Sequence, residues 1–291
     1  MSTLSDAVVS GTQQWVLFLV QWRLAALAVA RMRCVLAPLA IVGALSLCQC
    51  TSVYTTPPSE VLSYRRFDRI YVYRPQARAQ HLALLLSGDG GWSGTLGSIA
   101  ERLAAGGTVV AGIDVRHLLA SLSQDPATCV APGAELESLA RYLQQHYQLG
   151  PAAPVLIGHS AGATLAFVAL AESRPGVFAG AITLSFCADL DLMKPLCPNP
   201  GLEPPLPRSD GVRLRLPVAL PAPWIALHGL VDDVCPAADS RAYATAITTG
   251  RFVPLPDIDH GYRQMNRWWP QFEAAYRELL AIRTPHGAGT G

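Results

Sequence analysis

From about residue 68 onward, short apolar runs alternate with segments of helical periodicity. The apolar runs of strand length fall at 70–73, 82–86, 108–113, 155–157, 181–186, 225–227 and 251–254. Apolar residues recur at helical spacing over 96–103, 136–147, 161–172, 237–247 and 272–280. Strands that alternate with helices favour right-handed crossovers. The pattern therefore predicts an α/β fold with a mostly parallel central sheet and helices on both faces.

One segment interrupts this alternation. Residues 188–221 contain eight prolines and fall between two of the late strands. Long connections without regular structure are either functional or merely tolerated. Two interpretations stay open: a lid or substrate loop, and a surface loop held by a disulfide.

The N-terminal stretch has a different character. Residues 15–47 are almost wholly apolar, but a glutamine and three arginines interrupt them, so no clean span of roughly 20 apolar residues results. Residues 34–47, preceded by arginines, are typical of a signal peptide, and we expect translation to start at Met32. Cleavage before Cys48 as a lipoprotein, cleavage after Cys50 and an uncleaved membrane anchor are the alternatives. All three place the domain outside the cytoplasm, in the periplasm of a bacterial envelope.

The expected organisation is a leader at 1–50, a linker at 51–66, one globular domain at 67–284 and a flexible tail at 285–291. The chain is 51% hydrophobic and 15% charged, with a formal net charge of +1. A nucleic-acid-binding protein needs a concentrated basic face, which this sequence lacks. We expect a monomer without nucleic acid, cofactor or metal.

Four of the seven cysteines lie in the predicted domain, at positions 129, 187, 197 and 235. Cysteines in an exported domain indicate disulfides, and four of them allow three connectivities. None has the CxxC spacing of a zinc site. Because Cys187 and Cys197 close a short loop, we predict that they pair, which leaves Cys129 with Cys235.

The sequence Gly-His-Ser-Ala-Gly at 158–162 directly follows a predicted strand and directly precedes a predicted helix. This is the context that a nucleophile elbow requires. The sharp turn leaves no room for side chains at its flanks, hence the two glycines. Ser160 is therefore the candidate nucleophile, and the N–H of Ala161 is one candidate donor to an oxyanion.

A serine hydroxyl needs a histidine base, and the base needs an acid that fixes its tautomer. Asp232 follows a late strand, three residues beyond a turn glycine, and fits the acid better than Asp233. His260 follows the last strand and is the candidate base, in the chain order serine, acid, histidine. Neither His159, inside the elbow, nor His117 has this position.

The second oxyanion donor is expected in the loop Ser-Gly-Asp-Gly-Gly-Trp at 87–92, after an early strand. Its glycines allow the backbone to approach the substrate closely. We choose the N–H of Asp89. Together with Ser160, Asp232 and His260, this loop predicts the α/β-hydrolase fold in a single domain.

The chain resembles the VirJ/AcvB family of periplasmic, virulence-associated α/β hydrolases. The resemblance lies in the motifs at 87–92, 112–114 (Gly-Ile-Asp), 158–162 and 259–262 (Asp-His-Gly-Tyr), and it covers roughly residues 68–283. The family often has Gly-Tyr-Ser-Phe-Gly at the elbow, where this chain has a histidine and an alanine. AcvB-type chains also tend to carry a second domain that is absent here.

The resemblance implies a serine esterase that removes the amino acid from aminoacyl-phosphatidylglycerol at a membrane surface. Such esters carry an ammonium group, which Asp89 or Asp114 would bind; Trp92 and His159 are further candidates on the substrate side. The alternatives are a generic carboxylesterase or lipase, and a non-enzymatic accessory of a secretion apparatus that uses a hydrolase fold for binding.

Overall fold

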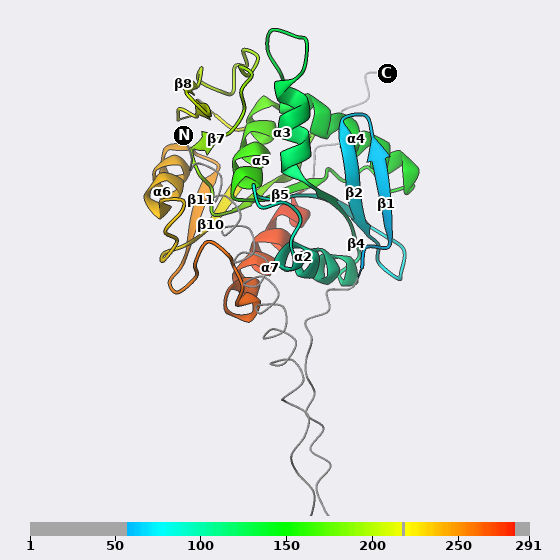
Figure 1. Cartoon of the computed structure of the whole chain (residues 1–291). Coiled ribbons are helices and arrows are strands. Elements are labelled where there is room, and N and C mark those ends of the chain that lie inside the picture. The colour runs from blue at the N-terminus through cyan, green and yellow to red at the C-terminus, as the bar shows by residue number, and fades with distance from the viewer. Residues whose placement is uncertain (1–56, 217–218, 283–291) are drawn as a thin grey trace, which may run out of the picture. The chain divides into compact units, whose positions relative to one another are not determined.

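The computed structural model describes residues 57–216 and 219–282. An eight-stranded sheet forms its centre, in the order β1-β2-β4-β3-β5-β6-β10-β11 (Figure 1). The strands are β1 (Glu60–Tyr64), β2 (Phe67–Tyr73), β3 (His81–Leu86), β4 (Thr108–Ile113), β5 (Val155–His159), β6 (Gly180–Leu184), β10 (Trp224–Gly229) and β11 (Gly250–Leu255). Only β1–β2 and β2–β4 pair antiparallel; the other five pairs are parallel.

Helices cover both faces of this sheet, as the alternation predicts. One face carries α2 (Gly94–Ala105) and α7 (Met265–Ala281), and the opposite face carries α3 (Val115–Ser123), α4 (Pro132–His146), α5 (Ala161–Glu172) and α6 (Ala237–Ala246) (Figure 1). Alternation along β3 divides its side chains between two cores: Leu84 and Leu86 pack on the α5 side, and Leu85 packs on the α2 side. The fold class predicted from periodicity is confirmed.

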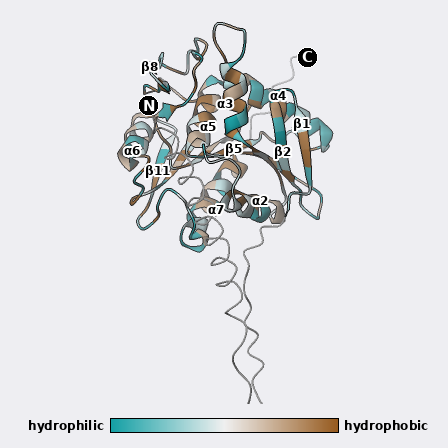
Figure 2. Cartoon of the chain, in the orientation of Figure 1, coloured by the Kyte–Doolittle hydropathy of each residue, from teal (hydrophilic) through white to brown (hydrophobic). Residues whose placement is uncertain are grey.

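The helix α5 differs from the others because it is apolar on every side. Ten consecutive residues, 162–171, are buried, and Figure 2 shows the apolar colour concentrated on the strands and on this helix. A helix that is hydrophobic all round belongs in the interior of the protein. The helix α5, which directly follows the nucleophile elbow, is therefore held by packing contacts on every side.

Outside the proline-rich segment, two elements were not expected. The strand β1 lies within 51–66, so the linker prediction is wrong for residues 60–64, which pair with β2 and extend the sheet. The helix α3 follows β4 directly, with Asp114 as its N-cap. The predicted leader and tail lie outside the described residues. Within 57–216 and 219–282 no helix is both long and apolar enough to cross a membrane.

The proline-rich segment has a structure of its own. Its strands β7 (Asp189–Leu190), β8 (Leu206–Arg208) and β9 (Gly211–Arg213) form a small antiparallel sheet. Leucines distributed along the segment are buried in the core on the α5 side, at positions 190, 192, 196, 202 and 214. These contacts favour the interpretation as a packed surface segment over that as a lid.

The disulfides connect this segment to the domain, but the predicted pairing is wrong. The structure joins Cys129 to Cys197 and Cys187 to Cys235, with Cα atoms 4.9 Å and 5.2 Å apart. The cause is backbone pairing between distant segments: the Cys197 N–H donates to the Val130 carbonyl at 2.8 Å, which places residue 197 beside residue 129. Cys187 follows β6, whose neighbour β10 leads into the turn that holds Cys235. Closeness in sequence was therefore misleading.

Candidate active site

Ser160 lies at the turn between β5 and α5. Its backbone has φ 54° and ψ −124°, a conformation that a non-glycine residue adopts only where the surroundings impose it. A Cβ on Gly158 would lie 2.1 Å from the Gly162 oxygen, and a Cβ on Gly162 would lie 2.2 Å from the Ser87 oxygen. The steric reason predicted for both glycines is confirmed.

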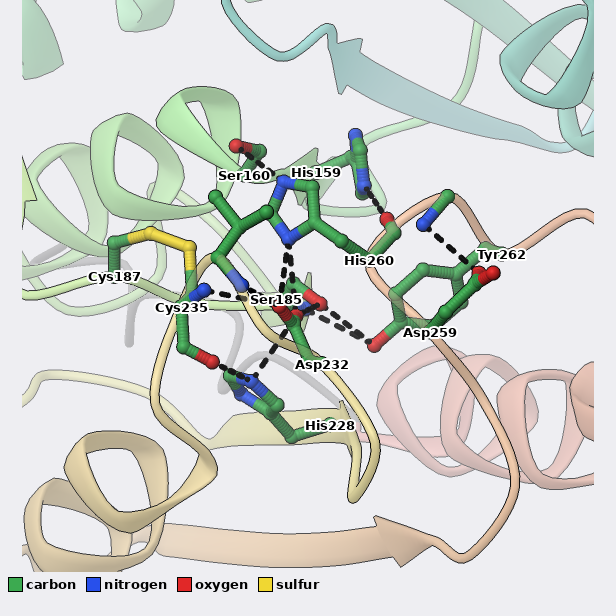
Figure 3. A network of polar contacts seen from close by, with 12 residues as sticks. His159, Ser160, Ser185, Cys187, His228, Asp232, Cys235, Asp259, His260 and Tyr262 are labelled. Atoms are coloured by element: carbon green, nitrogen blue, oxygen red, sulfur yellow. Dashed lines mark hydrogen bonds and ion pairs between the residues drawn. A yellow bond between two sulfur atoms is a disulfide. The ribbon is translucent and has the colours of Figure 1, made fainter.

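The side chains of Ser160, His260 and Asp232 form one hydrogen-bonded chain (Figure 3). His260 Nε2 lies 3.0 Å from Ser160 Oγ, and His260 Nδ1 lies 3.0 Å and 3.1 Å from the two oxygens of Asp232. A carboxylate only accepts, so Nδ1 carries the hydrogen and Nε2 is left to accept the serine proton. The geometry is that of a nucleophile, a base and an orienting acid.

The carboxylate of Asp232 is fully buried and surrounded by donors. Besides His260, it accepts hydrogen bonds from Ser185 Oγ and, at 2.9 Å each, from the N–H groups of Val234 and Cys235. Burial alone would raise its pKa, but the hydrogen bonds from His228, His260, Ser185 and the Cys235 N–H outweigh burial. The pKa of Asp232 therefore lies far below the usual value for aspartate, and the acid stays ionised.

The neighbouring Asp233 is exposed, as we expected for the residue that is not the acid. The helix that follows has Pro236 at its N-cap and no side-chain cap, so Asp233 does not cap it. The structure thus separates the two adjacent aspartates by their surroundings.

The expected oxyanion donors lie beside the nucleophile. A Cβ on Gly88 would be 3.1 Å from the Cβ of Ser160, so the 87–92 loop passes directly over the elbow. Within the described part of the chain, the N–H groups of Asp89 and Ala161 donate no hydrogen bond to a protein acceptor. Both are therefore free to bind an oxygen on which negative charge develops.

The side chain of Asp89 is exposed and turns back onto its own loop, where Oδ1 accepts the Gly90 N–H at 3.0 Å. Aspartates in glycine-rich turns commonly make this contact. Its other oxygen, Oδ2, makes no hydrogen bond to the described residues. The loop conformation explains why an aspartate is tolerated here.

The structure gives Asp114 and Trp92 structural partners. Asp114 caps α3 and binds the Arg116 guanidinium with both carboxylate oxygens, at 2.6 Å and 3.1 Å. Trp92 stacks on Tyr71, and a Cβ on Gly112 would lie 2.2 Å from its ring. The pairing with Arg116 counts against Asp114 as the group that binds an ammonium ion, and the contacts of Trp92 account for that side chain without a substrate.

His159 also has a partner within the protein. Its Nε2 donates to the backbone oxygen of His260 at 2.7 Å, and its ring packs edge-on against Tyr262. Burial lowers the pKa of His159, which favours the neutral ring. His159, which we expected on the substrate side, therefore holds the loop that carries the candidate base His260.

Sequence reasoning missed three buried polar residues behind Asp232: Ser185, His228 and Tyr262. Ser185 directly follows β6, with φ 52°, and the Tyr262 hydroxyl accepts its N–H at 3.1 Å while donating to the Leu227 oxygen at 2.9 Å. The sequence did contain a signal for these residues. Polar residues at the carboxyl ends of adjacent parallel strands meet at one edge of the sheet, the rule that identified Asp232.

Within residues 57–216 and 219–282, no group of three or more His, Cys, Asp or Glu side chains could hold a metal ion.

The comparisons with known proteins agree with the geometry of the site. The family model described as bacterial virulence protein (VirJ) matches residues 80–175, which include the 87–92 loop and the nucleophile elbow. No curated protein sequence matches the chain.

Hydrolases are among the solved structures similar to this one. A thermophilic esterase from the planctomycete Thermogutta terrifontis, bound to butyrate, has 20% identity and a TM-score of 0.51, over 80% of this chain and 98% of the esterase. Its propionate complex gives a TM-score of 0.53 at the same identity and coverage. A Klebsiella pneumoniae protein classed as a dienelactone hydrolase has 14% identity and a TM-score of 0.53, over 74% and 94% of the two chains. Over residues 80–175 the chain matches the VirJ family, as its motifs indicate, and its fold is the α/β-hydrolase fold.

Proposed function

We propose that the protein is a serine esterase of the bacterial cell envelope, with Ser160, His260 and Asp232 as its triad. The observation that carries the proposal is the continuous chain from Ser160 Oγ through His260 to the buried Asp232, at 3.0 Å on each side of the imidazole. The strained backbone of Ser160 supports it, because such strain persists where the surroundings impose it and is common at active sites.

In this mechanism Ser160 Oγ attacks the ester carbonyl while His260 Nε2 takes the hydroxyl proton. The N–H groups of Asp89 and Ala161 stabilise the oxyanion, and the N-terminus of α5 adds its dipole. His260 then gives the proton to the departing alcohol, which leaves an acyl-enzyme. Water, activated by His260, hydrolyses that ester and restores Ser160.

The substrate we propose is an aminoacyl ester of a phosphatidylglycerol-type lipid, as the family resemblance implies. Asp89 supports this choice because it belongs to the oxyanion loop, is exposed, and keeps Oδ2 without a hydrogen bond to the described residues. A carboxylate at this position can pair with the ammonium group next to the scissile carbonyl. We prefer Asp89 to Asp114, because the carboxylate of Asp114 already pairs with Arg116.

Asp89→Asn tests the substrate class, because it keeps the turn contact with Gly90 and removes the charge. We expect hydrolysis of an aminoacyl lipid to fall by roughly 30-fold or more, from an interaction on the order of 2–4 kcal/mol, with little change on a neutral short-chain ester. Asp68→Asn, at an exposed position on β2, is the matched control. Equal losses on both substrates would make Asp89 a scaffold residue and remove the support for an aminoacyl substrate.

A short-chain carboxylesterase is the second candidate. The observation that favours it is the similarity in fold to an esterase whose structures contain butyrate and propionate. Activity on neutral esters with none on aminoacyl lipids would select this candidate. A chain inactive on every ester would select the third, a binding accessory of a secretion apparatus.

Two disulfides in the domain fit a protein outside the reducing cytoplasm. We propose the periplasm, with attachment to a membrane through Cys48 or an uncleaved N-terminal segment. Globomycin treatment of expressing cells tests the lipoprotein route, since it blocks cleavage only of a lipid-modified precursor.

A further inference from the structure

His228 is a buried histidine that the proposed mechanism does not use. It lies near the end of β10, and its side chain has 0% exposure. Its Nδ1 lies 2.6 Å from Ser240 Oγ on α6, and its Nε2 lies 3.0 Å from the Cys235 oxygen and 3.4 Å from Asp232 Oδ2. Both ring nitrogens are thus engaged inside the protein.

These contacts determine which nitrogen carries a hydrogen. The Cys235 carbonyl can only accept, so Nε2 must carry its hydrogen, and the carboxylate of Asp232 lies 3.4 Å from the same nitrogen. On the other side of the neutral ring, Nδ1 then accepts the hydroxyl hydrogen of Ser240, whose Oγ lies 2.6 Å away. Asp232 therefore has a histidine N–H on each side, from His260 and from His228 (Figure 3).

We infer that His228 is a positioning residue that acts on the base His260 through Asp232. This inference rests on the proposed esterase function. It holds the 232–235 turn in place and, by donating to the carboxylate, limits how strongly Asp232 attracts the proton on His260. A carboxylate that loses one donor attracts its remaining partner more strongly. The other titratable groups that face this pair are His159 from β5 and Tyr262 from the loop after β11.

Three variants separate this role from packing. His228→Phe keeps a ring and removes both nitrogens; His228→Gln keeps a side-chain N–H that can reach the Cys235 oxygen and Asp232. Ser240→Ala removes only the partner of Nδ1 and leaves Nε2 unchanged, so it is the control for a lost buried hydrogen bond. Each is compared with the wild type by ester hydrolysis over a range of pH and by ¹⁵N NMR of the histidine rings.

For His228→Phe we expect kcat to fall roughly 10–100-fold with KM unchanged, the range that one hydrogen bond to a charged group supplies. The acid limb of the rate profile and the pH midpoint of the His260 ring signals should both move to higher pH. His228→Gln should restore most of kcat and return both midpoints toward wild type. Ser240→Ala should leave them in place.

The NMR midpoint of His260 does not depend on turnover, so the two claims fail separately. A wild type that hydrolyses no ester contradicts the proposed function, whereas a His260 midpoint unchanged in His228→Phe overturns the role of His228. If His228→Phe does not fold, the wild-type spectrum decides: His228 must carry a hydrogen on Nε2, and a ring protonated only on Nδ1 overturns the inference.

Discussion

Two regions of the molecule each bury a carboxyl group, and they shift its pKa in opposite directions. Asp232 sits among donors from five residues, His228 included, and is held ionised, with its pKa far below the usual range. Glu172, at the end of α5, accepts one hydrogen bond, from the Gly133 N–H at 2.6 Å, while its Oε1 has no partner among the described residues. Burial raises the pKa of Glu172 to about 7.

The difference shows that burial alone does not decide the charge of a carboxyl group. An ion taken out of water needs several hydrogen bonds to replace its hydration. The turn at Asp232 provides them and produces a permanent anion beside His260. The junction of α5 with α4 provides one, so Glu172 gains and loses its proton near neutral pH.

Loss of the anion at Asp232 should have the largest effect. Asp232→Asn is expected to lower kcat by roughly 10⁴-fold, because the amide cannot hold His260 in the tautomer that accepts the serine proton. Asp233→Asn, one residue away and exposed, is the matched control and should remain close to wild type. Rates on one ester substrate measure both. The reverse ranking would assign the acid to Asp233.

The two disulfides allow the regions of Asp232 and Glu172 to be tested separately, because each disulfide lies in one of them. Cys187–Cys235 fixes the turn that donates to Asp232, and Cys129–Cys197 fixes the segment before α4, near Glu172. Replacing both cysteines of either pair with alanine should lower stability by about 2–4 kcal/mol. Only loss of Cys187–Cys235 should also lower kcat, by roughly 10–100-fold, because the carboxylate of Asp232 would then be misplaced.

Urea unfolding and ester hydrolysis on the two double variants check this prediction. Equal kcat in both would mean that the Asp232 turn keeps its shape without the covalent bond. Peptide mapping of the wild type under non-reducing conditions first establishes the connectivity, and a Cys187–Cys197 peptide would contradict the structure.

Glu172→Gln should have the smallest effect, and it depends on pH. Because the folded-state pKa of Glu172 is raised, from 4.5 to about 7, the stability it contributes is present below the unfolded value and is lost as pH rises through 7. The variant should therefore be more stable than the wild type at pH 8, by on the order of 1–3 kcal/mol, and gain little at pH 4.

Asp232→Asn should show the opposite trend. A lowered pKa gives stability that is present at neutral pH and lost as pH falls, so the variant is less stable at pH 7 and approaches the wild type in acid. Thermal unfolding at several pH values follows both variants. Parallel curves would show that the two carboxyl groups do not differ in charge as their surroundings indicate.

The sequence was sufficient to predict the sheet, its covering helices and the three residues of the proposed triad. These depend on local patterns: alternation, helical spacing, and the positions of Ser160, Asp232 and His260, each in the segment that follows a strand. All three were found together at the edge of the sheet, because parallel strands place their carboxyl ends side by side.

What the sequence did not reveal depends on contacts between distant segments. The pairing of Cys197 with Cys129 follows from backbone hydrogen bonds across 68 residues, which no local spacing encodes. Two of the donors behind Asp232 are Ser185, which directly follows β6, and His228, which lies in β10. In the sequence both look like ordinary residues at strand ends, because only the pairing of the strands brings them to Asp232. The ion pair of Asp114 is a local contact, since its partner Arg116 lies two residues away, but the sequence analysis did not consider it.

The central claim is that Ser160 is a nucleophile activated by His260. The most direct test is labelling with a fluorophosphonate, followed by peptide mass spectrometry, in the wild type, Ser160→Ala, His260→Ala and Ser63→Ala, the last at an exposed position on β1. We predict one phosphonylated residue, Ser160, with no label in Ser160→Ala, roughly 10⁴-fold slower labelling in His260→Ala and labelling retained in Ser63→Ala. A wild type that folds but takes up no label, or label at any residue other than Ser160, would contradict the account.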